Sequence, residues 1–253
     1  MDRTMETILS RVQKPARYTG GEYNAVVKDP KQVDTRIAMC FPDTYEIGMS
    51  NLGVRILYGL MNELPGVWCE RVFAPWGDME EEMRREGLPL YGLESGDPIS
   101  DFDIIGFSLG YEMAYSNVLN MLDLAGLPLR SADRDEDAPL IIAGGTCAYN
   151  PEPLAPFVDI FSLGEGGDVT VGLIRLYQRA RPEGWSRQDL LAAAAKVPGL
   201  YVPSLYTVTY HEDGTVASVT PQEGAPELVT KRIVQDLDKS YFPVKTIVPS
   251  TEI

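Results

Sequence analysis

The sequence predicts an α/β protein with a doubly wound, mostly parallel sheet, flavodoxin-like or Rossmann-like, followed by a C-terminal β-hairpin and connector. Short apolar runs alternate with segments of helical period between residues 37 and 181, and glycine-rich turns follow several of these runs. The hydrophobic fraction of 44% is typical of a globular chain. Strands that alternate with helices form a parallel sheet, because right-handed crossovers place helices on both faces.

Residues 1–34 are predicted to form an N-terminal helix and an arm. Met5, Ile8, Leu9 and Val12 recur at helical spacing. Gly20 and Gly21 then interrupt the pattern, so the stretch around them is interpreted as a loop or arm.

The first half of the α/β domain, predicted over residues 35–198, begins with a buried strand at residues 37–41. A helix follows at residues 50–64, with Ser50 or Asn51 placed as its N-cap and Pro65-Gly66 at its end. Residues 70–74 then predict a short strand and residues 78–86 a charged helix.

The second half repeats the pattern. Residues 103–109 predict a buried strand and residues 111–124 its helix. Strands are also expected at residues 139–145 and within residues 158–167, where the second one runs into a glycine-rich turn. A helix is expected at residues 169–181. Among doubly wound folds we choose the flavodoxin-like strand order.

Residues 199–253 have a different character. Apolar and polar residues alternate on both sides of Glu212-Asp213-Gly214, which is a strong hairpin signal. The proline-rich stretch after residue 220 has no clear period and is interpreted as a connector that packs on something.

Composition excludes several classes of protein. The net charge of −15 argues against a direct nucleic-acid partner. No apolar run is long enough for a bilayer and no secretory signal opens the chain, so we expect a cytoplasmic protein without a membrane partner. Cys40, Cys69 and Cys147 are too far apart to suggest a disulfide framework or zinc site. The single histidine, His211, leaves no Ser-His-Asp triad or multi-histidine metal site unless it serves alone.

The candidate site lies at the carboxyl ends of the strands, where open parallel sheets bind ligands. Four loops reach this rim, and their glycines leave room for a ligand near the backbone. The candidate residues in these loops are Asp43, Thr44, Tyr45, Gly48, Ser108, Leu109, Gly110, Glu112, Gly144, Gly145, Thr146, Gly164, Glu165 and Gly166.

Each of these features also has a purely structural interpretation. Tight turns need glycine without any ligand, and the carboxylates of Asp43, Glu112 and Glu165 suit helix N-termini. Neither a dinucleotide-binding fingerprint nor a phosphate loop is present, which weakens dehydrogenase and ATPase functions. A free-standing hydrolase using Asp43 and Glu112 would need a nucleophile or metal that these residues do not supply.

Four stretches in order, DTYEIG, GFSLGYE, IIAGGTCAYNPEPL and DIFSLGEGG, resemble the cobalamin-binding-type domain at the N-terminus of many radical S-adenosylmethionine (SAM) proteins. The opening RYTGGEYNAVVKD with FPDTYEIGMSNLG is similar to an uncharacterised bacterial family in which such a domain precedes a radical SAM barrel. This resemblance implies that Ser108 and Gly144-Gly145 accommodate the nucleotide tail of the cofactor.

The sequence differs from the family pattern at the residue that binds cobalt. Cobalamin domains with D-x-H-x-x-G use that histidine as the lower ligand, whereas Tyr45 stands in the same frame here. A phenol is a poor cobalt ligand at neutral pH. Two alternatives stay open: cobalamin bound without a protein ligand, or a degenerate cobalamin fold that acts as a structural or interaction domain.

The resemblance also implies a partner domain. A radical SAM enzyme holds a [4Fe–4S] cluster with three cysteines, typically C-x-x-x-C-x-x-C, and this chain contains no such run. The cluster and SAM are therefore expected only in a longer parent protein, whose C-terminal radical SAM domain acts on an unknown substrate. The 253 residues are expected to be a fragment of that parent, inactive alone and without catalytic or metal-binding residues of their own.

Overall fold

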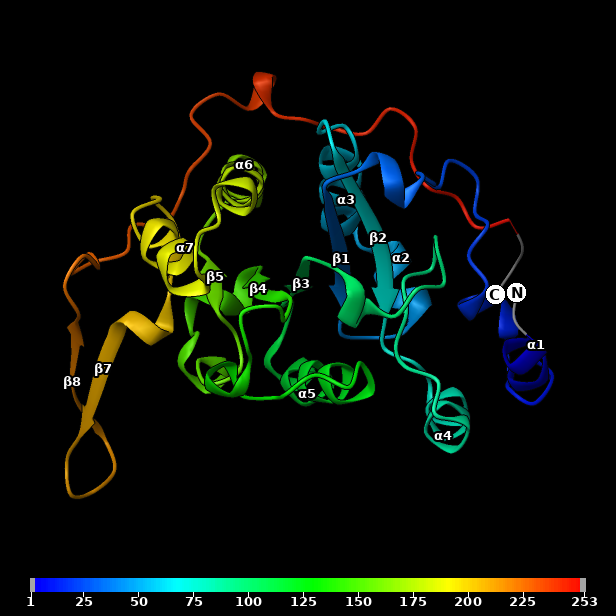
Figure 1. Ribbon diagram of the computed structural model, residues 1–253, viewed down its shortest axis with the longest axis horizontal. Coiled ribbons are helices and arrows are strands. Elements are labelled where there is room, and N and C mark those ends of the chain that lie inside the picture. Colours follow the sequence, from blue (N-terminus) through cyan, green and yellow to red (C-terminus); the bar gives the residue numbers. More distant parts are fainter. Residues whose placement is uncertain (1–2, 251–253) are drawn as a thin grey trace.

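The computed structural model describes residues 3–250, in which one six-stranded sheet forms the centre of the molecule (Figure 1). The strand order is β2-β1-β3-β4-β5-β6, and every neighbouring pair is parallel except β5 and β6. The first five strands have the flavodoxin-like order. The predicted fold class is confirmed. The strands are β1 (Thr35–Phe41), β2 (Val67–Phe73), β3 (Ile104–Ser108), β4 (Leu140–Gly144), β5 (Ile160–Ser162) and β6 (Leu200–Tyr201).

Helices cover both faces of the sheet. On one face lie α3 (Leu52–Asn62) and α6 (Gly166–Glu183), and on the other lie α4 (Gly77–Glu86) and α5 (Tyr115–Leu124) (Figure 1). The predicted N-terminal helix forms as α1 (Arg3–Leu9) and packs beside α4. Alternation along the strands divides the core: in β1, Ile37 and Met39 face α3 and α6, whereas Ala38 and Cys40 face the other helices.

Three elements differ from the sequence prediction. The stretch expected as a loop after β1 folds into α2 (Tyr45–Ser50). Asn51 separates this helix from α3, because its side chain accepts a hydrogen bond from the Val54 amide and caps the start of α3. The helix α7 (Arg187–Ala194) and the short strand β6 were not predicted. The glycine-rich turn after β5 is also shorter than expected, because Gly166 already begins α6.

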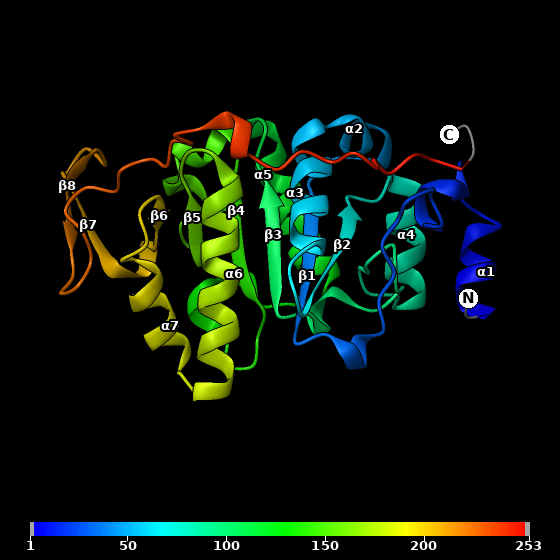
Figure 2. The ribbon, with the colours of Figure 1, turned by 90° about the horizontal axis from the view of Figure 1, so that it is seen from above.

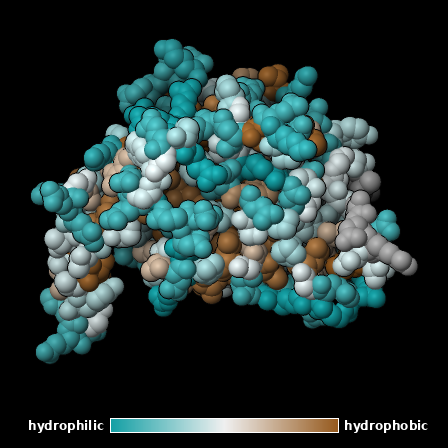
Figure 3. All heavy atoms as spheres, viewed as in Figure 1, coloured by the Kyte–Doolittle hydropathy of each residue, from teal (hydrophilic) through white to brown (hydrophobic). Residues whose placement is uncertain are grey.

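The predicted hairpin forms from β7 (Tyr206–Tyr210) and β8 (Val216–Pro221) and projects away from the sheet (Figure 1). Hydrophobic side chains remain visible on it in the space-filling view (Figure 3). No helix among residues 3–250 is both long and apolar enough to cross a bilayer.

Residues 228–248, called the strap, connect opposite ends of the molecule. Figure 2 shows this segment running along the edge where the strands end, past α6 and α3. The strap pairs with the chain after β5 at Arg232 and with the N-terminal arm at Val248, whose backbone exchanges hydrogen bonds of 2.9 and 3.1 Å with Tyr23. The stretch that the sequence predicted as a connector therefore packs on the chain after β5 at one end of the strap and on the N-terminal arm at the other.

Candidate functional site

A cavity of about 200 Å³ lies between the sheet and the helices α3 and α6. Strands β1, β3, β4 and β5 form its floor, and Leu57 and Met61 from α3 face Val169 and Leu173 from α6 across it. None of the side chains that line it carries a charge. The cavity therefore suits a neutral, largely apolar group.

The floor is apolar at its centre and polar at its carboxyl end, because of the strand register. Ser108 on β3 pairs with Gly144 on β4, and Gly144 pairs with Ser162 on β5. Two residues earlier, the corresponding row contains Gly106 and Ile142. Alternation along a strand places both rows on the same face, so two hydroxyl residues flank a glycine above an apolar floor.

Gly144 ends β4 and Gly145 follows it, and the structure explains glycine differently at the two positions. Gly145 has φ of +106°, and a Cβ there would lie 2.6 Å from the Leu109 carbonyl oxygen. Its backbone alone requires glycine. Gly144 has no positive φ, and a Cβ there would lie 3.5 Å from Ser162 Cβ, an ordinary contact. The backbone does not demand glycine at 144, so its effect is to leave the floor open.

Packing requires glycine at two of the four other candidate positions, Gly48 and Gly164. A Cβ on Gly48 would enter the ring of Phe73, and one on Gly164 would collide with the backbone of Arg232 in the strap. Gly166 lies close to Leu57, where α6 approaches α3. Only Gly110 has open space around the position of its missing Cβ among these four.

Tyr45 lies in the core, outside the set of residues that line the cavity. Only 3% of it is exposed, its ring contacts Phe73 edge to face, and its hydroxyl donates a 2.7 Å hydrogen bond to Glu22. Burial and the neighbouring Glu22 carboxylate raise the pKa of the phenol. Glu22 in turn accepts a 2.6 Å hydrogen bond from the buried guanidinium of Arg71. The Tyr45 side chain, at the position of the cobalt-ligating histidine in D-x-H-x-x-G, is thus fixed inside the protein.

The candidate carboxylates have separate partners and do not converge. Asp43 accepts a 2.6 Å hydrogen bond from Tyr111, and Glu165 accepts one from the backbone of Val234 in the strap. Glu112 is exposed at the start of a 3-10 turn. None of these three side chains makes the hydrogen bond of a helix N-cap, and they offer no pair for acid–base chemistry.

Of the predicted residues, the structure brings five together around the cavity: Ser108, Gly144, Gly145, Gly164 and Gly166. Nine do not line it: Asp43, Thr44, Tyr45, Gly48, Leu109, Gly110, Glu112, Thr146 and Glu165. Sequence reasoning missed Gly106, Ser162 and Thr170, which do. Ser162 follows Ile160 by two residues in the last parallel strand. Because alternate residues of a strand point to the same face, the predicted strand was enough to place Ser162 on the face of Ile160.

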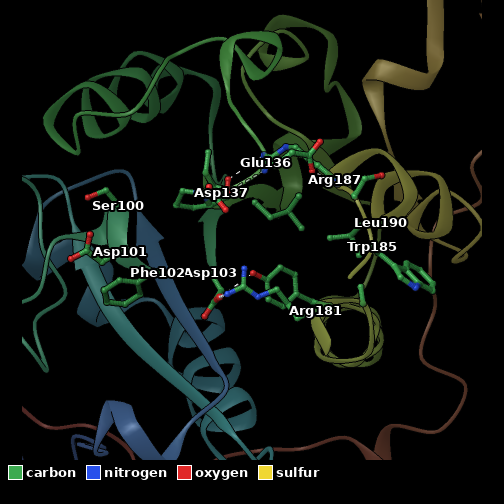
Figure 4. Close-up of a pocket in the computed structure, with 16 residues that line it drawn as sticks. Ser100, Asp101, Phe102, Asp103, Glu136, Asp137, Arg181, Trp185, Arg187 and Leu190 are labelled. Atoms are coloured by element: carbon green, nitrogen blue, oxygen red, sulfur yellow. Dashed lines mark hydrogen bonds and ion pairs between the residues drawn. The ribbon is translucent and has the colours of Figure 1, made fainter. Parts of the chain in front are cut away.

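A second hollow, of about 250 Å³, lies at the opposite edge of the sheet, where the strands begin (Figure 4). Several of its polar groups pair with one another: Tyr177 donates to Asp103 at 3.0 Å, and Arg181 lies 3.5 Å from the same carboxylate. Arg187 pairs with the buried Asp159 at 2.7 Å. None of the predicted candidate residues lines this hollow.

Within residues 3–250 no group of three or more histidine, cysteine or acidic side chains is placed to hold a metal ion. Cys40, Cys69 and Cys147 are buried and unpaired. Burial raises the pKa of the Cys40 thiol. These cysteines therefore serve as small core residues in this part of the molecule.

Residues 53–203 match the family described as the N-terminal part of radical SAM proteins. The chain belongs to this family. The matched region contains α3, β3, β4, β5 and α6, and so most of the walls and floor of the cavity.

The chain is also similar to an uncharacterized protein of Methanocaldococcus jannaschii, with 26% identity over 141 residues. This alignment covers 54% of the chain and 26% of the relative, so the chain spans about a quarter of that protein's length. No solved structure matches the chain.

Proposed function

We propose that this chain is the N-terminal module of a radical SAM enzyme and that its cavity binds the nucleotide tail of cobalamin, with no protein ligand to cobalt. The observation that carries the proposal is the row of Ser108, Gly144 and Ser162 above an apolar floor. Glycine at 144 leaves space that the backbone does not require. Family membership supports the wider assignment to a radical SAM protein.

The size and chemistry of the cavity fit a planar heteroaromatic ring. An apolar cavity of about 150 Å³ holds benzene, so about 200 Å³ has room for a larger, two-ring group. The tail of cobalamin ends in such a group, and its ring nitrogen needs a hydrogen-bonding partner when it is not on cobalt. Ser108, at the carboxyl end of the cavity, offers a hydroxyl for this purpose.

The chain has no imidazole that fits the position below cobalt. Tyr45 occupies that frame and is bonded to Glu22, and the single histidine, His211, is exposed beside the hairpin turn. When bound, cobalamin supplies a cobalt centre that can carry an alkyl group. In this proposal the protein's own residues bind the tail and leave the lower face of cobalt without a side-chain ligand.

The longer protein would contribute the remaining cofactors. Its radical SAM domain would supply the cysteines of a [4Fe–4S] cluster and bind SAM, and its substrate is unknown. Large apolar side chains are exposed in segments that follow β1, β3 and β4, including Leu52, Met113 and Tyr149. We propose that the companion domain covers this edge, and that residues 35–198 form the module, with residues 1–34 as arm and 199–253 as hairpin and linker.

A second candidate function is a degenerate cobalamin fold that acts only as a structural or interaction domain. The observation in its favour is the fixed position of Tyr45, which ties α2 to the arm and to β2 through Glu22 and Arg71. In that case the cavity would be a remnant, and corrinoid would not be retained.

The test is a titration of the purified chain with hydroxocobalamin, followed by gel filtration and a visible spectrum. We expect retained corrinoid without the spectral shift of an imidazole ligand. Gly144→Ala adds a methyl group to the floor at ordinary contact distance and should weaken retention by about five- to 150-fold, since overfilling a site costs ~1–3 kcal/mol.

The matched control is Gly172→Ala on α6, where nothing lies within 4 Å of the added methyl group. This variant should bind like the wild type. Absence of corrinoid from the wild-type fraction would favour the degenerate domain, and equal retention by Gly144→Ala would exclude the cavity as the tail site.

A further inference from the structure

Ser162 contains a polar atom that the fold leaves without a partner. Its Oγ is buried, and no residue in the described range 3–250 forms a hydrogen bond with it. Buried hydroxyls in native proteins are normally hydrogen-bonded, because water is lost on burial and must be replaced. An unpartnered hydroxyl that lines a cavity is available to hydrogen-bond a group that binds there.

The register places Ser162 directly across from Ser108. The two serines lie on either side of Gly144, and neighbouring strands are about 4.8 Å apart, so their Cα atoms are separated by roughly 10 Å. A flat ring resting over Gly144 would have one hydroxyl at each edge. Thr170 of α6 adds a third hydroxyl to the lining.

The surroundings limit the class of group that Ser162 can recognise. No lysine, arginine, aspartate or glutamate lines the cavity, so a phosphate or carboxylate would lack a counter-charge there. A hydroxyl can donate to a ring nitrogen or accept from a ring N–H. The chemistry therefore favours a neutral nitrogen heterocycle.

We infer that Ser162 is a second recognition residue of the cavity, one that hydrogen-bonds the heteroaromatic base of the bound tail from the edge opposite Ser108. This inference rests on the proposed tail site, and it names a residue that neither the sequence pattern nor family membership assigns. Ser162 positions the base and selects for it, and it takes no part in chemistry.

The test compares Ser162→Ala with the wild type for three probes: hydroxocobalamin, cobinamide, which lacks the nucleotide tail, and free 5,6-dimethylbenzimidazole. We expect the variant to bind hydroxocobalamin and the free base about three- to tenfold more weakly, the usual effect of one lost hydrogen bond. Cobinamide should bind both proteins equally. Ser116→Ala, an exposed serine on α5 on the opposite face, is the matched control.

Stability without ligand provides a second readout. Because the Ser162 hydroxyl has no partner, Ser162→Ala should melt at the wild-type temperature or above it, whereas a hidden structural bond would lower the melting temperature. Equal binding of the free base by the variant and the wild type, or no binding by the wild type, would overturn the inference. A different result would refute the proposed cofactor but not the role of Ser162: the wild type fails to retain hydroxocobalamin, yet it binds the free base more tightly than Ser162→Ala does.

Discussion

At the scale of single residues, Arg71 explains why Tyr45, at the position of the cobalt-ligating histidine in other cobalamin domains, is held inside the protein. Its guanidinium is 1% exposed and pairs with Glu22 at 2.6 Å and Glu94 at 2.7 Å. Burial raises the pKa of Glu94 more than Arg71 lowers it. For Glu22, burial acts in the same direction, but Arg71 and the Tyr45 hydroxyl together outweigh it and lower the pKa.

Replacement of Tyr45 by Phe should therefore cost stability in a pH-dependent way. The variant keeps the ring but removes the donor to Glu22, and we expect a loss of ~1–2 kcal/mol in the free energy of unfolding at neutral pH. A lowered folded-state pKa contributes stability that is present above the unfolded value near 4.5 and is lost as pH falls through the folded value. The difference between variant and wild type should therefore shrink in acid.

Urea denaturation at neutral pH and below about pH 4 measures this difference. Tyr210→Phe, on the exposed hairpin, is the control and should change stability at neither pH. An equal loss for Tyr45→Phe at both pH values would show that the hydroxyl does not act through the Glu22 carboxylate.

Position along a strand was enough to place some candidate residues at the cavity, whereas the location of others depends on a distant partner. Ser108 and Gly144 were predicted because they end strong apolar runs. The burial of Tyr45 depends on Glu22, which is 23 positions away in an arm without periodicity. Ser162 was missed because the candidate residues near this strand began at Gly164, in the loop after it, whereas Ser162 is the last residue of the strand itself.

At the scale of elements, strong periodicity was sufficient for the central strands and for α3, α4, α5 and α6. The unpredicted α7 has a run of alanines and little amphipathic pattern, so its start depends on the capping box between Ser186 and Asp189. The strand β6 has two residues, too few to show any period. Such elements form because their neighbours provide a partner, and that information is not local.

The strap makes a prediction at the same scale. Ile247 anchors its end in the core with 5% exposure, beside the backbone pair of Tyr23 and Val248. Ile247→Ala should release this end and speed hydrogen exchange at the Tyr23 and Val248 amides. The free energy of global unfolding should fall much less than in Ile105→Ala, a fully buried β3 residue for which ~2–5 kcal/mol is expected.

Hydrogen exchange by NMR, together with urea denaturation of both variants, separates the two effects. If Ile247→Ala and Ile105→Ala lowered the free energy of unfolding equally, the strap would be part of the cooperative core. Unchanged exchange at the Tyr23 and Val248 amides would show that Ile247 does not hold the strap.

At the scale of the whole molecule, the cavity is a consequence of topology. The connections through α4 and α5 place those helices on one face, and the other face is covered by α3 near β1 and β2 and by α6 near β5 (Figure 1). Between α3 and α6 the sheet is covered only by side chains from these two helices, and the cavity lies beneath them. The fold class could therefore locate the ligand edge, but the depth of the cavity depends on glycines whose role becomes visible only through register.

The net charge of −15 makes a prediction for the molecule as a whole. Excess negative charge destabilises the compact state by self-repulsion, and salt near 0.15 M reduces the Debye length to ~8 Å. Exposed ion pairs such as Arg84 with Glu80 also weaken in salt, but each contributes at most ~1 kcal/mol. The buried contacts of Arg71 are screened little.

We therefore expect the melting temperature to rise as sodium chloride increases from low concentration to about 0.15 M. Choline chloride should produce the same rise if screening is the cause, and a fall in both salts would mean that attractive surface pairs outweigh the net repulsion.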